Sequence, residues 1–213
     1  MLEIRTVEAE DFLSQLNHLA ALLQSTGYKV LPYRDDTLPL YQALSPHQQK
    51  EVMRNLKAYC LALSDGLLDE EEFNATRFAW RFLVAVGYFP NEELFDTLRE
   101  EIYVQIYNFD QFQIFRSLSF FEQCSLSLEE ILCRPWWQLW KRSRHDLHIL
   151  SEVSRQSLAS PVGRTMRFEL PFEKVEEICG TQSHQFAYRI KSATALTRSG
   201  RLHATLLVED WLI

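Results

Sequence analysis

Glycine is scarce in this sequence, with six among 213 residues. Phosphate-binding loops and dinucleotide-binding folds depend on closely spaced glycines, and neither G-x-G-x-x-G nor G-x-x-x-x-G-K-[ST] occurs. The nucleophile elbow G-x-S-x-G and the zinc-protease motif H-E-x-x-H are absent as well. Because these common catalytic motifs are missing, we expect a protein that is not an enzyme.

Basic residues are outnumbered by acidic ones, 22 against 29, which gives a net charge of −7 and a pI near 5.4. Phosphate contacts need clustered Lys and Arg, and the only basic run is Lys141–Arg144. We therefore expect no nucleic-acid partner. No apolar run approaches the ~20 residues of a membrane span, and the first residues lack the pattern of a secretory signal. We expect a cytoplasmic protein with no membrane span.

Cysteine is also infrequent, and its positions show no C-x-x-C pair or regular spacing. Neither a disulfide framework nor a zinc site is predicted, and we expect the thiols to be reduced and mostly buried. The acidic run 69–72 is predicted to begin a helix, whose first turn favours acidic side chains, rather than to bind a metal. The four cysteines are Cys60, Cys124, Cys133 and Cys179.

Residues 1–88 have the pattern of an all-α segment. Ser45 and Gln48 form a capping box around a proline at the first helical position, and Gly27 stands where a helix C-cap is expected. The apolar spacing and these caps predict helices over about 6–25, 46–66 and 78–86, with an extended connection over 28–44.

Residues 90–213 alternate between helical and strand patterns. Asn91 caps a helix, and Ser199-Gly200 forms a tight turn between two long alternating runs. The fold class is therefore α+β, with a five-stranded antiparallel sheet flanked by short helices. The predicted helices cover 92–99, 119–123, 127–132 and 143–157, and the predicted strands cover 102–107, 112–115, 164–170, 185–197 and 201–213.

The most distinctive segment runs from Leu126 to Trp140 and reads LSLEEILCRPWWQLW. Ser127 and Glu130 form a capping box, and Pro135 ends the short helix so that the following tryptophans point in a new direction. This segment and the order of elements around it resemble a PAS-type sensory domain over residues 90–213. The connection 171–180 is longer than is usual in that family.

The resemblance implies a pocket for a small molecule between the sheet and the segment that carries the tryptophans. It implies a sensory regulator that acts through a separate signalling partner. The alternative is a dimerisation or interaction module whose core is filled and binds no ligand, in which the tryptophans are ordinary core residues. The expected ligand-binding residues are Phe115, Phe120, Trp136, Trp137, Trp140, His145 and Tyr188.

His145-Asp146 is similar to the connecting helix of oxygen-sensing haem PAS domains, which implies that His145 could bind haem iron, with Arg164 or Arg167 above a bound gas. The alternatives are that His145 faces solvent or that His148 is the buried histidine. Flavin photochemistry is not expected, because Cys133-Arg134 matches only two residues of the flavin-binding core.

The resemblance also implies a homodimer. PAS-like domains commonly pair through the helix before the first strand, and this helix carries an apolar stripe that a second copy could cover. The alternative is that the stripe packs on the helical half of the same chain. The stripe consists of Leu94, Phe95, Leu98 and Ile102.

Overall fold

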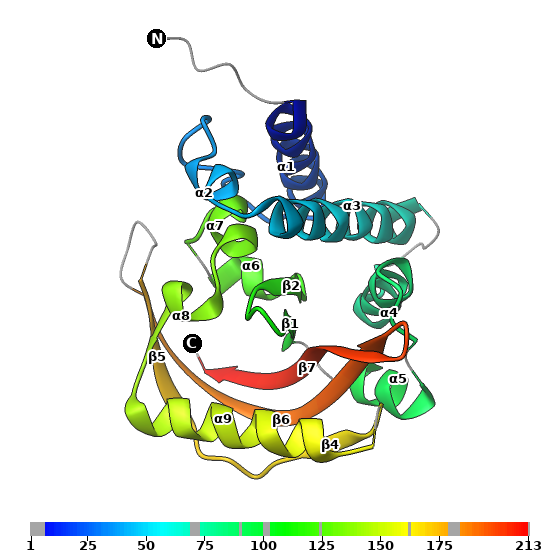
Figure 1. The fold of residues 1–213 in the computed structure, drawn as a ribbon, viewed down its shortest axis with the longest axis vertical. Coiled ribbons are helices and arrows are strands. Elements are labelled where there is room, and N and C mark those ends of the chain that lie inside the picture. The colour runs from blue at the N-terminus through cyan, green and yellow to red at the C-terminus, as the bar shows by residue number, and fades with distance from the viewer. Residues whose placement is uncertain are drawn as a thin grey trace.

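The computed structural model describes residues 7–68, 73–89, 91–99, 103–123, 125–161, 163–178 and 184–212. Within these residues the chain forms nine helices and seven strands, which confirms the α+β class. Figure 1 shows α1, α2 and α3 on one side of the β1–β2 hairpin and α9 on the other side, along β6. None of the described helices is long and apolar enough to span a membrane.

The N-terminal helices agree with the sequence pattern at most of their ends. Gly27 has the positive φ of a C-cap, and the capping box is present, since the amide of Gln48 donates to Ser45 Oγ at 3.3 Å. Asn74 caps α4 by accepting from the amide of Arg77, while residues 69–72 lie outside the described part. The helices are α1 (Val7–Ser25), α2 (Pro39–Gln42), α3 (Pro46–Leu68), α4 (Ala75–Ala85) and α5 (Glu92–Arg99).

Helix α2 lies in the stretch that was predicted to be extended. Its first amides are satisfied by a distant side chain, because the Glu129 carboxylate accepts from the amides of Leu40 at 3.0 Å and Tyr41 at 3.2 Å. A carboxylate at the positive end of a helix stabilises it. Sequence within 28–44 could not reveal this helix, since the stabilising group stands almost ninety residues further along the chain.

The sheet is antiparallel, and its strands lie in the order β2-β1-β7-β6-β5-β3, with β4 also paired to β6. The strands are β1 (Tyr103–Asn108), β2 (Gln113–Arg116), β3 (Trp140–Arg142), β4 (Thr165–Arg167), β5 (Glu173–Glu177), β6 (Gln185–Arg198) and β7 (Arg201–Leu212). Ser199-Gly200 is the turn between β6 and β7, as predicted, and both residues have positive φ.

The prediction of five strands is wrong in number. The expected strand over 164–170 is shortened to β4, which pairs with β6. The chain then forms an additional strand, β5, that pairs with another part of β6. Pro171 interrupts the pairing between them because proline has no amide to donate. The short β3 follows the tryptophans directly and pairs with β5. Of the two unexpected strands, β3 depends on a partner that is distant in sequence, whereas β5 pairs with the strand that follows it along the chain.

Short helices and one long helix connect the hairpin to the later strands. Ser127 and Glu130 complete the predicted capping box, and Ser143 caps the long helix by accepting from the amide of Asp146 at 3.0 Å. These helices are α6 (Phe120–Gln123), α7 (Leu128–Cys133), α8 (Trp136–Leu139) and α9 (Arg144–Ala159).

The apolar stripe on α5 packs inside the chain. Leu94 and Leu98 are buried, and the ring of Phe95 meets Trp80 of α4 edge to face, with ring centroids 5.2 Å apart. Ile102 lies outside the described residues. The structure therefore has the alternative arrangement, in which α5 packs on the helical half. The homodimer stays a prediction, and this stripe does not offer it a free apolar face.

Cys60 and Cys133 are free and buried, as predicted. Burial raises the pKa of the Cys60 thiol to about 12 and the pKa of Cys133 well above its usual value, so both thiols stay protonated at neutral pH. Cys124 and Cys179 lie outside the described residues.

The two parts of the chain share one core. Buried side chains from the helices before residue 88 and from the sheet belong to a single cluster. At its centre Phe115 of β2 packs against Tyr59 at 5.5 Å, Phe78 at 5.4 Å and Phe82 at 4.8 Å between ring centroids. The boundary near residue 88 is thus a change in element type within a continuous core.

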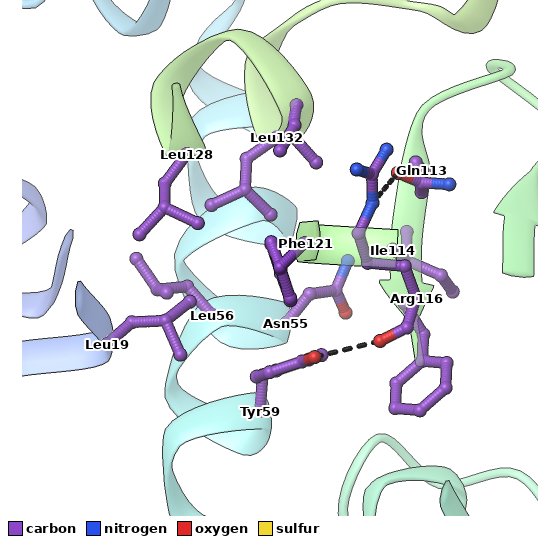
Figure 2. Close-up of a pocket in the computed structure, with 12 residues that line it drawn as sticks. Leu19, Asn55, Leu56, Tyr59, Gln113, Ile114, Arg116, Phe121, Leu128 and Leu132 are labelled. Carbon is purple, nitrogen blue, oxygen red and sulfur yellow. Dashed lines mark hydrogen bonds between the residues drawn. The ribbon is translucent and has the colours of Figure 1, made fainter. Parts of the chain in front are cut away.

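A buried hydrogen bond crosses this junction (Figure 2). The Tyr59 hydroxyl of α3 donates to the backbone carbonyl of Arg116 at 2.8 Å, and Arg116 Nε donates to Gln113 Oε1 at 2.7 Å. Apolar side chains close the space around them, so water has little access to the carbonyl. The bond therefore fixes β2 against α3.

We predict that Tyr59→Phe lowers the free energy of unfolding by about 1–3 kcal/mol, because the buried carbonyl of Arg116 loses its donor. Urea unfolding followed by circular dichroism measures this change. Tyr33→Phe is the matched control, since the described part of the chain contains no hydrogen bond from the Tyr33 hydroxyl, and it should change stability little. Equal effects of the two substitutions would contradict the assignment.

Candidate functional site

A cavity of about 280 Å³ lies between α9, the loop after β1, Trp136 of α8 and one face of β1 and β7. By contrast, the space at the α3–β2 junction measures only about 20 Å³. Small-molecule sites are commonly concave, mainly apolar and fitted with a few polar groups. The lining residues are Tyr107, Asn108, Phe109, Gln111, Trp136, Arg142, Leu147, Leu150, Ser151, Ser154, Leu158, Thr205, Leu207 and Glu209.

Strand alternation and helix periodicity place these side chains. Thr205, Leu207 and Glu209 are alternate residues of β7, so they project from the same face of the sheet. Helix α9 buries Asp146 and Val153 against the rest of the chain. Beside them, residues spaced three or four apart along the helix form a stripe that faces the cavity. The stripe consists of Leu147, Ser151, Ser154 and Leu158.

Arg142 contributes a buried positive charge to the wall. Its side chain is 5% exposed, and Nη1 donates to Asp146 Oδ2 at 2.9 Å and to the Tyr188 hydroxyl. The guanidinium also lies over the rings of Tyr188, at 4.6 Å, and Trp136, at 5.3 Å. Among the described residues Nε has no hydrogen-bond partner. Asp146 and the two rings hold Arg142 in place with one edge of the guanidinium unpaired.

Glu209 contributes a buried carboxyl group. It is 2% exposed, and Oε2 accepts from Gln105 Nε2 and from Trp211 Nε1, both at 2.7 Å. Burial raises its pKa, although Arg142 and the two hydrogen bonds act in the opposite direction. No described residue donates to Oε1. A carboxyl group whose pKa is raised inside a cleft is a candidate for function.

A chain of buried hydrogen bonds runs from Glu209 across the sheet. Gln105 joins it to β1, where Gln105 Oε1 accepts from the Tyr107 hydroxyl and from Gln113 Nε2. Gln113 Oε1 in turn accepts from Arg116, whose carbonyl is bonded to Tyr59 of α3. The cavity wall is thereby linked through β7, β1 and β2 to the N-terminal helices.

Aromatic side chains fill the space beside the cavity. Phe120, Trp140 and Tyr188 surround Trp211, with ring centroids 5.3, 5.8 and 5.5 Å from it. These three side chains were predicted to bind ligand, and here they form the packed wall behind the cavity. Tyr188 is also tied to the site by its hydroxyl, which donates to Asp146 Oδ1 at 2.5 Å.

The other expected ligand-binding residues lie in different places. Trp136 lines the cavity, and its indole nitrogen donates to Gln111 Oε1 at 2.7 Å. Trp137 is 49% exposed, and Phe115 packs on the opposite face of the sheet against α3 and α4. Of the seven expected residues, Trp136 alone is among those that line this cavity.

His145 does not fit an axial ligand of haem in this cavity. Its side chain is 66% exposed, and Nδ1 lies 2.9 Å from Glu173 Oε1. Because Ser143 sets the start of α9, Asp146 takes the inward position and His145 the outward one. His148, Arg164 and Arg167 are exposed too. No cluster of three metal-ligating side chains occurs among the described residues.

Sequence reasoning missed the two buried charged residues of the site, Arg142 and Glu209. Glu209 had no clear signal, since it lies with Thr205 and Leu207 on the face opposite the apolar alternation of Leu206 and Val208, where a charged residue is expected to face solvent. Arg142 had none, because β3 was not predicted. No family model, curated protein or solved structure matches this chain.

We predict that Glu209→Gln gains stability relative to the wild type as the pH rises above 4.5, the usual pKa of the group. Below that pH the carboxyl is protonated in both states. At higher pH the carboxyl ionises freely in the unfolded chain. In the folded chain it keeps its proton or ionises at a cost in free energy, so the wild type loses stability relative to the variant. Urea unfolding between about pH 4 and pH 8 measures the difference.

Thr205→Val is the control for this experiment. It changes a neighbouring cavity residue of similar shape that carries no titratable group, so its stability offset from the wild type should not vary with pH. Parallel pH profiles for the wild type and Glu209→Gln would show that ionisation of Glu209 does not oppose folding.

Proposed function

We propose that this protein is a PAS-like sensory regulator that binds a small molecule in the cavity between α9 and β1–β7 and signals through protein contacts. The observation that carries the proposal is a cavity whose lining includes a buried arginine and a buried carboxyl group. The order of a helix, a hairpin, short helices, a long helix and further antiparallel strands is also compatible with the sequence resemblance.

The charged wall favours binding over a purely structural role. Burying charged groups is unfavourable unless they are fully paired, and an apolar wall would be more stable. Arg142 and Glu209 each keep donor or acceptor capacity that no described residue uses. A ligand that completes these interactions would recover part of the cost of burial.

The alternative of a filled interaction module has one observation in its favour. The aromatic group around Trp211 already packs the part of the sheet next to the cavity, and the expected residues Phe120, Trp140 and Tyr188 belong to it. In that case the remaining space would be a groove without a physiological small-molecule ligand.

The hydrogen-bond chain suggests where a binding signal would go. A ligand that contacts Glu209 changes the charge or position of this carboxyl, and Gln105, Gln113 and Arg116 connect it to Tyr59 on α3. A ligand shifts an equilibrium by its differential affinity for two states. We propose that the two states differ in how α3 and its neighbours present their outer surface to the output partner.

We predict that Ser154→Trp abolishes ligand binding with little loss of stability, because Ser154 is an exposed residue of α9 that faces the cavity. Native mass spectrometry of protein from cells detects a co-purified small molecule, and thermal unfolding detects the stabilisation it provides. His148→Trp is the matched control, since it adds the same bulk to an exposed position that is not among the cavity residues.

A ligand that is present in the wild type and in His148→Trp but absent in Ser154→Trp would support the proposal. The filled-module alternative would be favoured if the wild type carries no small molecule and is not stabilised by metabolite extracts. A ligand retained in Ser154→Trp would place the binding site elsewhere.

A further inference from the structure

We infer that the cavity takes a small, net-neutral molecule that presents a hydrogen-bond acceptor and a hydrogen-bond donor on one polar edge and is apolar elsewhere. The inference rests on the proposed function and adds the chemical class of the ligand. It stands on three features of the wall: the unpaired edge of Arg142, the unused oxygen of Glu209 and the apolar stripe of α9 with Leu207.

The acceptor is required by Arg142. Both of its hydrogen bonds use Nη1, to Asp146 and to Tyr188, and Nε has no partner among the described residues. Nε is shielded from solvent, and no described residue accepts from Nη2, so Nη2 is the donor that a ligand carboxylate or carbonyl oxygen would meet in the cavity. An unpaired buried donor is unfavourable, so a ligand oxygen at this edge stabilises the complex.

The donor is required by Glu209. Its two hydrogen bonds, from Gln105 and Trp211, both go to Oε2, so in the ionised form Oε1 is left to accept from a ligand N–H. Glu209 and Arg142 both line the same cavity, so one small molecule can reach the two groups. The polar edge of the ligand therefore carries an acceptor and a donor close together.

Charge and hydrogen bonding together disfavour singly charged ligands. Asp146 already neutralises Arg142 at 2.9 Å, and Glu209 is a second acid in the same wall. A singly charged anion would be repelled by the two carboxylates, and a singly charged amine could pair with Glu209 but would leave the free donor of Arg142 without an acceptor. The neutral phenol of Tyr107 adds no charge, because burial raises its pKa.

Size and apolar lining define the rest of the ligand. A cavity of about 280 Å³ is at the small end of the range of ligand sites, so the ligand has on the order of ten non-hydrogen atoms. Leucines from both walls and Phe109 would cover its apolar part. Two kinds of molecule share this chemistry: a zwitterionic amino acid with an apolar side chain, and a neutral amide on an apolar ring.

Two matched sets of probes test the inference with the full chain. The first set is L-leucine, 4-methylpentanoate, which lacks the ammonium group, and 3-methylbutylamine, which lacks the carboxylate. The second set is benzamide, benzoate and benzylamine. Isothermal titration calorimetry at millimolar concentration measures each affinity. We expect leucine or benzamide to bind at least about tenfold more tightly than either singly charged analogue in its set.

Two variants locate the polar contacts. Glu209→Gln keeps the size of the side chain and can still accept from Gln105 and Trp211, but it carries no charge. Its one oxygen is held by Gln105 and Trp211, so an NH2 group replaces Oε1 and cannot accept from the ligand. The variant should weaken both leucine and benzamide binding, leucine by about tenfold or more because its ammonium also loses the carboxylate charge. Arg142→Lys should weaken both, because a compact ammonium cannot hold Asp146 and Tyr188 and also reach the ligand oxygen as the planar guanidinium does. His148→Ala is the control and should bind as the wild type does.

Tighter binding by an anion or an amine than by its neutral partner would overturn the inference. So would unchanged affinities in Glu209→Gln that is shown by circular dichroism to be folded. If none of the six probes binds while a co-purified ligand is lost in Ser154→Trp, the ligand class is wrong and the proposed function stands. If neither the probes nor any co-purified molecule binds, both fail.

Discussion

The pairing of β6 with β7 is the interaction on which the rest of the structure depends. These are the two longest strands, and between them they pair with three of the other five: β1 pairs with β7, and both β4 and β5 pair with β6. In a strand successive side chains point to opposite faces, so one register decides two surfaces at once. Leu206 and Val208 go to the core, while Leu207 and Glu209 go to the cavity side. A slip of one residue would exchange them.

The polar interior of the sheet follows from this register. Glu209 lies beside β1, where Gln105 donates a hydrogen bond to it, and the chain continues through Gln113 to Arg116. Buried polar groups are tolerated when each is bonded, and a connected network also fixes one arrangement of the strands. One exception lies at the cavity, where Arg142 Nε has no partner in the described residues. The same network that aligns the sheet thus ends at the proposed binding site.

Much of the fold could be predicted from the sequence, and the unpredicted parts share one cause. The long helices and the turn at Ser199-Gly200 are encoded by spacing and caps within a few residues. Helix α2 needs the carboxylate of Glu129, β3 needs β5, and β5 needs a free part of β6. The site divides in the same way. Trp136 was expected from its local motif, whereas Arg142 depends on a strand that no local pattern predicts.

The sequence by itself determined most of the helices and strands, where most of these begin and end, and that Pro135 redirects the chain at the tryptophans. These features depend on short-range steric and hydrogen-bonding preferences. The tertiary structure decided that His145 faces solvent while Asp146 holds Arg142, that Phe115 serves the opposite face, and that Glu209 meets an open cavity. Such outcomes depend on helix phase and strand register, which only contacts between distant segments fix.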